Sequence, residues 1–167
     1  MGLLFSLVLI LALCSTSTAQ EKIKISGKGI YAYTMRPMVE FDDVEGHAIF
    51  VSKWEGMNWS KGEHKFMDQA EVHFISYGDY IKGNGPFWGY IKMSQGGDVI
   101  YSKFKGKTTT TLSPEGKPIT IFEGTIKFVR GTGQYEGIQG SGTFKNKMIS
   151  STIQMSEWEG EYFIKKE

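Results

Sequence analysis

The chain after Gln20 contains no window with helical periodicity, and this feature limits its fold more than any other. Instead, apolar and polar residues alternate in short runs separated by Gly, Pro, Asn, Asp and Ser, which is the pattern of half-buried strands joined by turns. These runs lie at 23–33, 46–54, 69–77, 87–93, 99–105, 119–129, 141–148 and 152–164. Because they are closely spaced and no crossover helix separates them, we expect the strands to pair antiparallel.

About eight strands predict an all-β fold, a single eight-stranded antiparallel β-barrel, because closure removes the exposed edges of a sheet. A β-sandwich is the alternative that strand count leaves open. Gly96-Gly97 gives the clearest hairpin signal. The polar segment from Glu55 to Asp68 is expected to form one long loop. A barrel of this size encloses either packed side chains or one small ligand.

The first residues resemble an export signal. An uncharged apolar run from Leu3 to Leu13 is too short to cross a bilayer comfortably, and small residues at Ser17 and Ala19 predict cleavage after Ala19. Residues 1–19 are therefore predicted to be a signal peptide and residues 20–167 the folded domain, secreted or periplasmic and without a transmembrane segment. Lipidation of Cys14 is an alternative, although Leu13 is larger than the residue that usually precedes a lipidated cysteine.

Several classes of chemistry find no support in the sequence. Nineteen basic and 18 acidic residues give a net charge of +1, which provides no overall field to attract nucleic acid. Gly106-Lys107-Thr108 and the glycine-rich segment 131–137 imitate nucleotide-binding loops, but neither has the required spacing or a following helix. The three histidines lie in no metal-ligand motif, so we expect no metal and no cofactor. Asn58-Trp59-Ser60 is a formal glycosylation sequon.

The remaining candidates are aromatic and polar side chains on different strands. We predict that Trp54, His73, Tyr90 and Glu123 point inward and line one cavity, where a ligand stacks on Trp54 and Tyr90 and hydrogen-bonds to His73 or Glu123. The corresponding function is non-enzymatic binding of a small apolar or aromatic molecule, or of a partner protein.

Two other functions remain open. One is a cyclase or isomerase that acts on a hydrophobic substrate in the lumen, with Glu71, His73 or Glu123 as an acid. The other is an interaction protein that works through its outer surface.

The C-terminal half carries a family resemblance. The stretch from Gly131 to Gly142, GTGQYEGIQGSG, is similar to a glycine-rich stretch of the allene oxide cyclase barrel-like superfamily, which includes the dirigent proteins. The ending Trp158-Glu159-Gly160-Glu161-Tyr162 resembles that of small secreted bacterial members. The resemblance implies an eight-stranded barrel and a homo-oligomer, a trimer in characterised relatives. It transfers no catalytic residue, because the inward acids of those relatives have no counterpart here.

Overall fold

The computed structural model describes residues 20–165, which form nine strands and one short 3-10 helix. The elements are β1 (Ile23–Met35), β2 (Met38–Phe41), β3 (His47–Lys61), β4 (Glu71–Ile81), β5 (Gly85–Gln95), β6 (Asp98–Leu112), β7 (Pro118–Gly131), η1 (Gly133–Tyr135), β8 (Ile138–Met148) and β9 (Ile153–Ile164). All paired strands are antiparallel.

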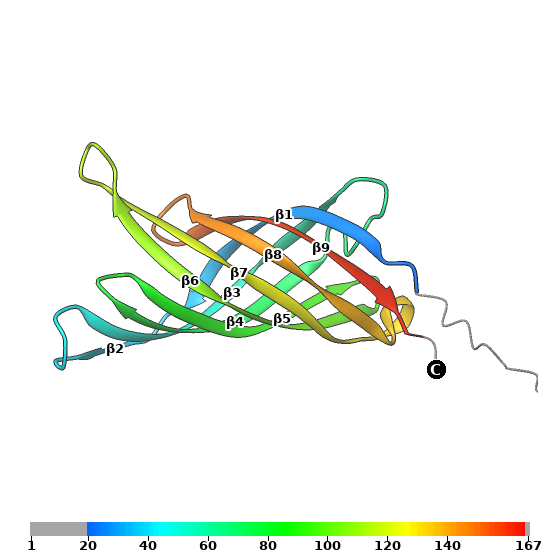
Figure 1. The fold of residues 1–167 in the computed structure, drawn as a ribbon, viewed down its shortest axis with the longest axis horizontal. Helices are drawn as coiled ribbons and strands as arrows, with labels where there is room; N and C mark the ends of the chain where they lie inside the picture. Colours follow the sequence, from blue (N-terminus) through cyan, green and yellow to red (C-terminus); the bar gives the residue numbers. More distant parts are fainter. Residues whose placement is uncertain (1–19, 166–167) are drawn as a thin grey trace, which may run out of the picture.

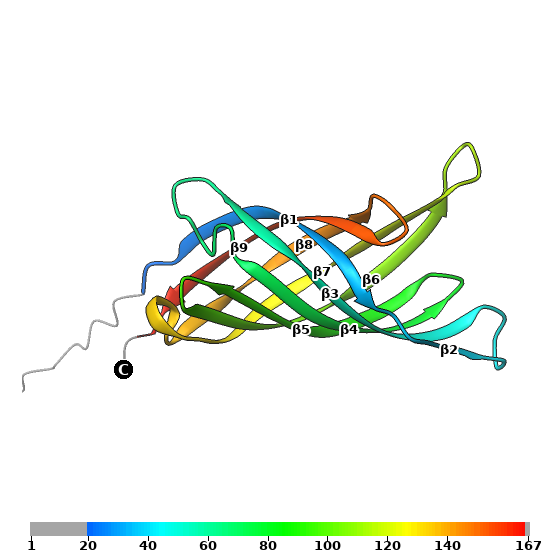
Figure 2. The same cartoon turned by 180° about the vertical axis from the view of Figure 1, so that it is seen from behind.

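The sheet closes on itself through β1. Strands β3 to β9 are neighbours in chain order, and β1 pairs with both β9 and β3. Eight strands therefore make a closed barrel, which confirms the predicted fold and excludes the sandwich. The one additional strand, β2, lies outside the barrel and pairs only with the first residues of β3. Figures 1 and 2 show an elongated barrel in which β2 and the β6–β7 hairpin extend at one end, while β9 ends at the other.

The predicted hairpin at Gly96-Gly97 is confirmed. Gln95 and Asp98 are paired residues, so the loop between them contains only the two glycines, with φ of 58° and 96°. Positive φ at both positions suits the right-handed twist of the flanking strands, and glycine adopts it without steric cost.

The predicted loop from Glu55 to Asp68 is wrong in its first half, because β3 continues to Lys61. The reason is that small and polar residues face inward in this part of β3, while an apolar residue faces outward. The inward positions are Gly56, Asn58 and Ser60, whereas Met57 on the outer face is 38% exposed. An inner face of small and polar residues has no apolar alternation for sequence reading to detect.

One end of the barrel is closed by the segment between β3 and β4. Its Phe66 and Met67 are buried with Ile100, Phe128 and Tyr135 in one apolar cluster. Met67 is fully buried and has a φ of 46°, a left-handed conformation that packing must hold in place. We call this the plugged end, and the end with β2 and the β6–β7 hairpin the open end.

Two further expectations concern the signal peptide and membrane-spanning helices. The predicted signal peptide, with Cys14, lies outside the described residues. Within residues 20–165, no helix is both long enough and apolar enough to cross a membrane.

Candidate functional site

A cavity runs along the barrel interior above the plugged end. Its volume, as space open to the centre of a water molecule, is about 180 Å³. Side chains from all eight barrel strands line it. The lining is buried toward the plugged end, where Trp54 is 3% and Val72 1% exposed. Thr110 and Thr120 at the opposite end are only half-buried, so the cavity opens toward the open end.

Aromatic rings form a large part of the wall. Trp54 stacks on Phe74 with ring centres 5.5 Å apart and planes 12° from parallel. Phe74 meets Phe104 edge-on at 5.9 Å, and Phe104 meets Phe87 at 6.0 Å. The strand register brings these rings together, because Trp54 is paired with Phe74 on the inner face of neighbouring strands. Such a wall suits a flat, apolar molecule.

The same wall carries buried polar atoms that lack a hydrogen-bond partner among the described residues. They are Ser102 Oγ, Thr108 Oγ1 and Asn146 Oδ1. Each residue lines the cavity and is at most 9% exposed. Leaving such a group unsatisfied costs about 1–3 kcal/mol, so these atoms are available to hydrogen-bond a molecule in the cavity.

Arg36 lies at the mouth, on the connection between β1 and β2. Its guanidinium carbon is 4.6 Å from the ring centre of Phe50 and 5.0 Å from that of Tyr33. No carboxylate of residues 20–165 forms an ion pair with it. The mouth therefore presents a cation held between two aromatic faces.

Three tyrosines contribute hydroxyl groups to the cavity. Burial raises the pKa of Tyr31, Tyr33 and Tyr80 above the ordinary value of 10.0. All three phenols stay protonated at neutral pH. They can donate hydrogen bonds to a ligand, but they cannot serve as phenolate bases.

Of the four predicted site residues, only Trp54 lies inside. His73 contacts Glu71 at 2.9 Å on the outer face, Tyr90 is 53% exposed, and Glu123 pairs with Lys145 at 2.7 Å outside the barrel. The prediction that four side chains share one cavity is therefore wrong for His73, Tyr90 and Glu123.

The reason is the two-residue period of a strand. Phe74, Ile91 and Phe122 are the chain neighbours of those three residues, and they occupy the inward positions instead. A strand that places one residue inward must place the next outward. The apolar face of β4, with Val72 and Phe74, is indeed the inner one.

Asn58 was unsuspected as a structural residue. It is 1% exposed, and its Nδ2 donates to the Met67 carbonyl at 2.7 Å while its Oδ1 accepts from Trp158 Nε1 at 2.8 Å. It thereby ties the plug to β3 and β9. The sequon that contains Asn58 is inaccessible in the folded protein.

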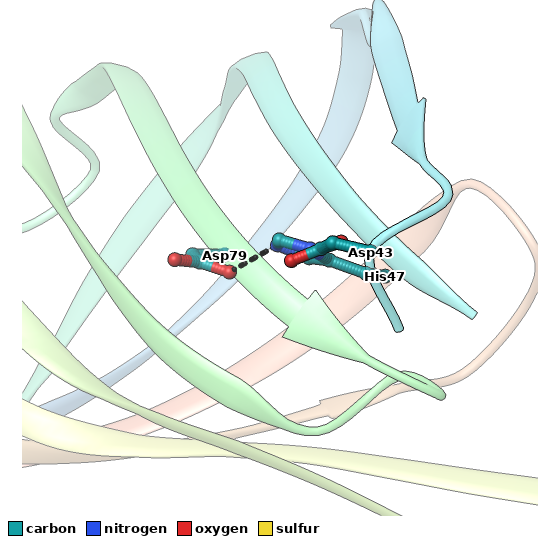
Figure 3. A network of polar contacts seen from close by, with 3 residues as sticks. All are labelled: Asp43, His47 and Asp79. Carbon is teal, nitrogen blue, oxygen red and sulfur yellow. Dashed lines mark hydrogen bonds and ion pairs between the residues drawn. The ribbon is translucent and has the colours of Figure 1, made fainter. Parts of the chain in front are cut away.

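A polar network lies on the outer surface of the open end (Figure 3). His47 Nδ1 is 2.5 Å from Asp43 Oδ1, and His47 Nε2 is 3.0 Å from Asp79 Oδ1. The hydrogen bond with Asp43 raises the pKa of His47, and the same bond lowers the pKa of Asp43. The network joins the turn after β2 to β4. In the described part of the chain, no group of three or more His, Cys, Asp or Glu residues is arranged to hold a metal.

Comparisons with known proteins assign the chain to no family. No family model matches it, and no curated protein matches it. Among solved structures, it is similar to a pterocarpan synthase dirigent protein, with a TM-score of 0.48 and 10% sequence identity over 88% of this chain and 97% of that one. The barrel assignment above stands on the strand pairing of this chain.

Proposed function

We propose that this protein is an exported β-barrel that binds one small aromatic or apolar molecule in its lumen and does not catalyse a reaction. The observation that carries the proposal is the interior cavity, whose lining combines aromatic rings with three unpartnered polar atoms. A mostly apolar wall with a few polar groups that fix orientation is the usual composition of a ligand pocket.

The chemistry of the lining supports binding over catalysis. The acids considered for a cyclase or isomerase, Glu71, His73 and Glu123, all face outward and none lines the cavity. Apart from Glu159 on β9, which is exposed, the titratable lining residues are tyrosines whose raised pKa keeps them protonated, together with Arg36 at the mouth. These groups can orient a ligand, but they offer no base at neutral pH.

The wider assignment rests on sequence. The glycine-rich stretch from Gly131 to Gly142 supports membership of the allene oxide cyclase barrel-like and dirigent-like superfamily, and with it a homo-oligomer. Export rests on the signal-like residues 1–19. Expression of the whole chain in a bacterium, followed by intact-mass analysis, tests export. A periplasmic product that begins at Gln20 supports it, and an unprocessed cytoplasmic product contradicts it.

Lumen binding is tested with N-phenyl-1-naphthylamine, a neutral aromatic dye that fluoresces in apolar sites. We expect saturable binding to the protein. Trp54→Ala should weaken it about tenfold, the effect of losing roughly 1.4 kcal/mol of ring contact. Trp88→Ala is the matched control, because Trp88 is an outer-face tryptophan that is 48% exposed.

Loss of a buried tryptophan can also destabilise the barrel, so a second variant fills the cavity instead. Ser76→Phe adds a ring to a lining position and should abolish dye binding while β-type circular dichroism persists. Unchanged dye affinity in both Trp54→Ala and Ser76→Phe would overturn the proposed lumen site.

A further inference from the structure

The outer wall formed by β5, β6 and β7 concentrates exposed rings and cations, although the chain as a whole is nearly neutral. We call it the basic-aromatic face and define it by Trp88, Tyr90, Tyr101, Lys103, Lys105 and Lys127, all of them exposed. These strands are direct neighbours in the sheet (Figure 1). The outward period of each strand therefore places the six side chains on one continuous surface.

Rings and cations alternate across this face. Lys105 is paired with Trp88, and Lys103 is paired with Tyr90. The Lys103 ammonium lies 5.5 Å from the ring centre of Tyr90. On β4, Tyr77 extends the aromatic row by stacking on Trp88 with ring centres 6.2 Å apart. A molecule lying across the strands would meet flat apolar rings and positive charges in turn.

The charges on this face are uncompensated. Lys103 is paired directly with Lys127, and like charges at opposite positions of an antiparallel pair are destabilising. Some lysines elsewhere on the barrel do form ion pairs, as in Lys145–Glu123 at 2.7 Å and Lys53–Glu55 at 2.8 Å. No carboxylate within residues 20–165 forms an ion pair with Lys103, Lys105 or Lys127. An anionic partner would relieve the repulsion that the fold leaves in place.

We propose that the basic-aromatic face binds an acidic polysaccharide. The apolar faces of sugar rings pack on Trp88 and Tyr90, and the carboxylates of the polymer pair with Lys103, Lys105 and Lys127. The choice of a polysaccharide rests on the proposed export, which places the protein among extracellular polymers. The same proposed export disfavours a nucleic acid as the partner. A membrane is disfavoured because charged side chains separate the exposed rings.

Affinity electrophoresis in gels that contain polygalacturonate tests the proposal, with neutral dextran as the reference polymer. We expect retardation by polygalacturonate alone, weakening with added salt. Lys103→Gln combined with Lys127→Gln should reduce the affinity several-fold, and Trp88→Ala should also reduce it. The matched control is Lys24→Gln combined with Lys28→Gln, which removes the same charge from exposed positions of β1, on the opposite wall of the barrel.

Several outcomes would overturn the proposal. One is an equal loss of affinity in the two double variants, because that indicates general attraction rather than this face. Another is preferential binding of a dT oligonucleotide or of phosphatidylglycerol vesicles. The lumen is assessed separately with N-phenyl-1-naphthylamine. Trp54→Ala should weaken dye binding and leave polygalacturonate binding unchanged, whereas Trp88→Ala should weaken polygalacturonate binding and leave dye binding unchanged. Failure of either site therefore leaves the other measurable.

Discussion

Phe104 on β6 folds its ring over Gly89, its paired residue on β5. A Cβ atom at Gly89 would come within 2.5 Å of Phe104 Cζ and 2.0 Å of the Ile75 carbonyl oxygen. The pairs Gly106–Phe87 and Gly124–Phe144 repeat the arrangement, with a Cβ 2.7 and 2.8 Å from the phenylalanine Cζ. Rings that cover bare backbone keep the wall thin and leave room for a cavity.

Gly89→Ala should therefore lower the free energy of unfolding by about 1–3 kcal/mol, because the methyl group overlaps both a ring and a backbone oxygen. Urea denaturation followed by circular dichroism measures this. Gly116→Ala is the control. A Cβ atom at Gly116 meets no atom within 4 Å, so this substitution tests only the effect of the positive φ of 76°. A smaller loss in Gly89→Ala than in Gly116→Ala would contradict the packing role of Gly89.

Asn58→Leu should destabilise the plugged end. The substitution leaves Trp158 Nε1 without an acceptor, at about 1–3 kcal/mol, and it leaves the Met67 carbonyl with only the Ala70 N–H as a donor. Trp158→Phe should also destabilise the protein, because it leaves Asn58 Oδ1 unpaired. Hydrogen exchange checks the location: protection should fall first at amides of the plug, such as Gln69, which donates to the Asn58 carbonyl. A uniform fall over all strands would contradict this assignment.

The His47 network predicts a defined pH dependence. The raised pKa of His47 means that its stabilising contribution is complete below about pH 6.5, the ordinary imidazole pKa, and is lost as the pH rises through the higher folded-state pKa. The lowered pKa of Asp43 means that its contribution is present above its ordinary pKa and is lost as the pH falls through the folded-state pKa.

The melting-temperature difference between the protein and His47→Gln should therefore be largest at about pH 5–6 and should shrink in alkaline buffer. His64→Gln serves as the control, because His64 is exposed and its ring forms no hydrogen bond with residues 20–165. A difference that grows with rising pH would refute the network.

Lys127→Glu should stabilise the barrel, by roughly 0.2–1 kcal/mol, because it replaces the repulsion with Lys103 by an attraction. Thermal unfolding at low ionic strength measures the gain, which salt should reduce. Lys105→Glu is the control, since its paired residues are Trp88 and Thr125 rather than a cation. The same Lys127→Glu variant should bind polygalacturonate more weakly, so stability and binding should change in opposite directions.

Arg36 should favour aromatic anions at the cavity mouth. Arg36→Gln is expected to weaken binding of 1-anilinonaphthalene-8-sulfonate more than binding of the uncharged N-phenyl-1-naphthylamine, because only the first dye carries a sulfonate for the guanidinium. Fluorescence titration compares the two dyes. Lys103→Gln removes a cation that lies over the outer-face Tyr90, and it should change the binding of neither dye. An equal loss for both dyes would show that Arg36 acts by packing alone.

The sequence by itself determined the strands, their antiparallel order and several turns. These features are local: alternation sets a strand, and the positive φ available to Gly96 and Gly97 sets a hairpin. Trp54 was correctly predicted to face inward. The short strand β2 was not predicted. Its four residues are all exposed, so neither face is buried and the sequence needs no alternation of apolar and polar residues there.

Only the tertiary structure decided which side of each strand is the inside. His73, Tyr90 and Glu123 lie one position from inward residues, and a period of two makes either face possible until the barrel closes. Closure through β1 and β3 fixes the inner face for all eight strands at once. It also places Gly56, Asn58 and Ser60 inside, where Asn58 holds the plug through contacts with residues far away in the chain. Contacts of that kind depend on the register of distant strands, so no local pattern encodes them.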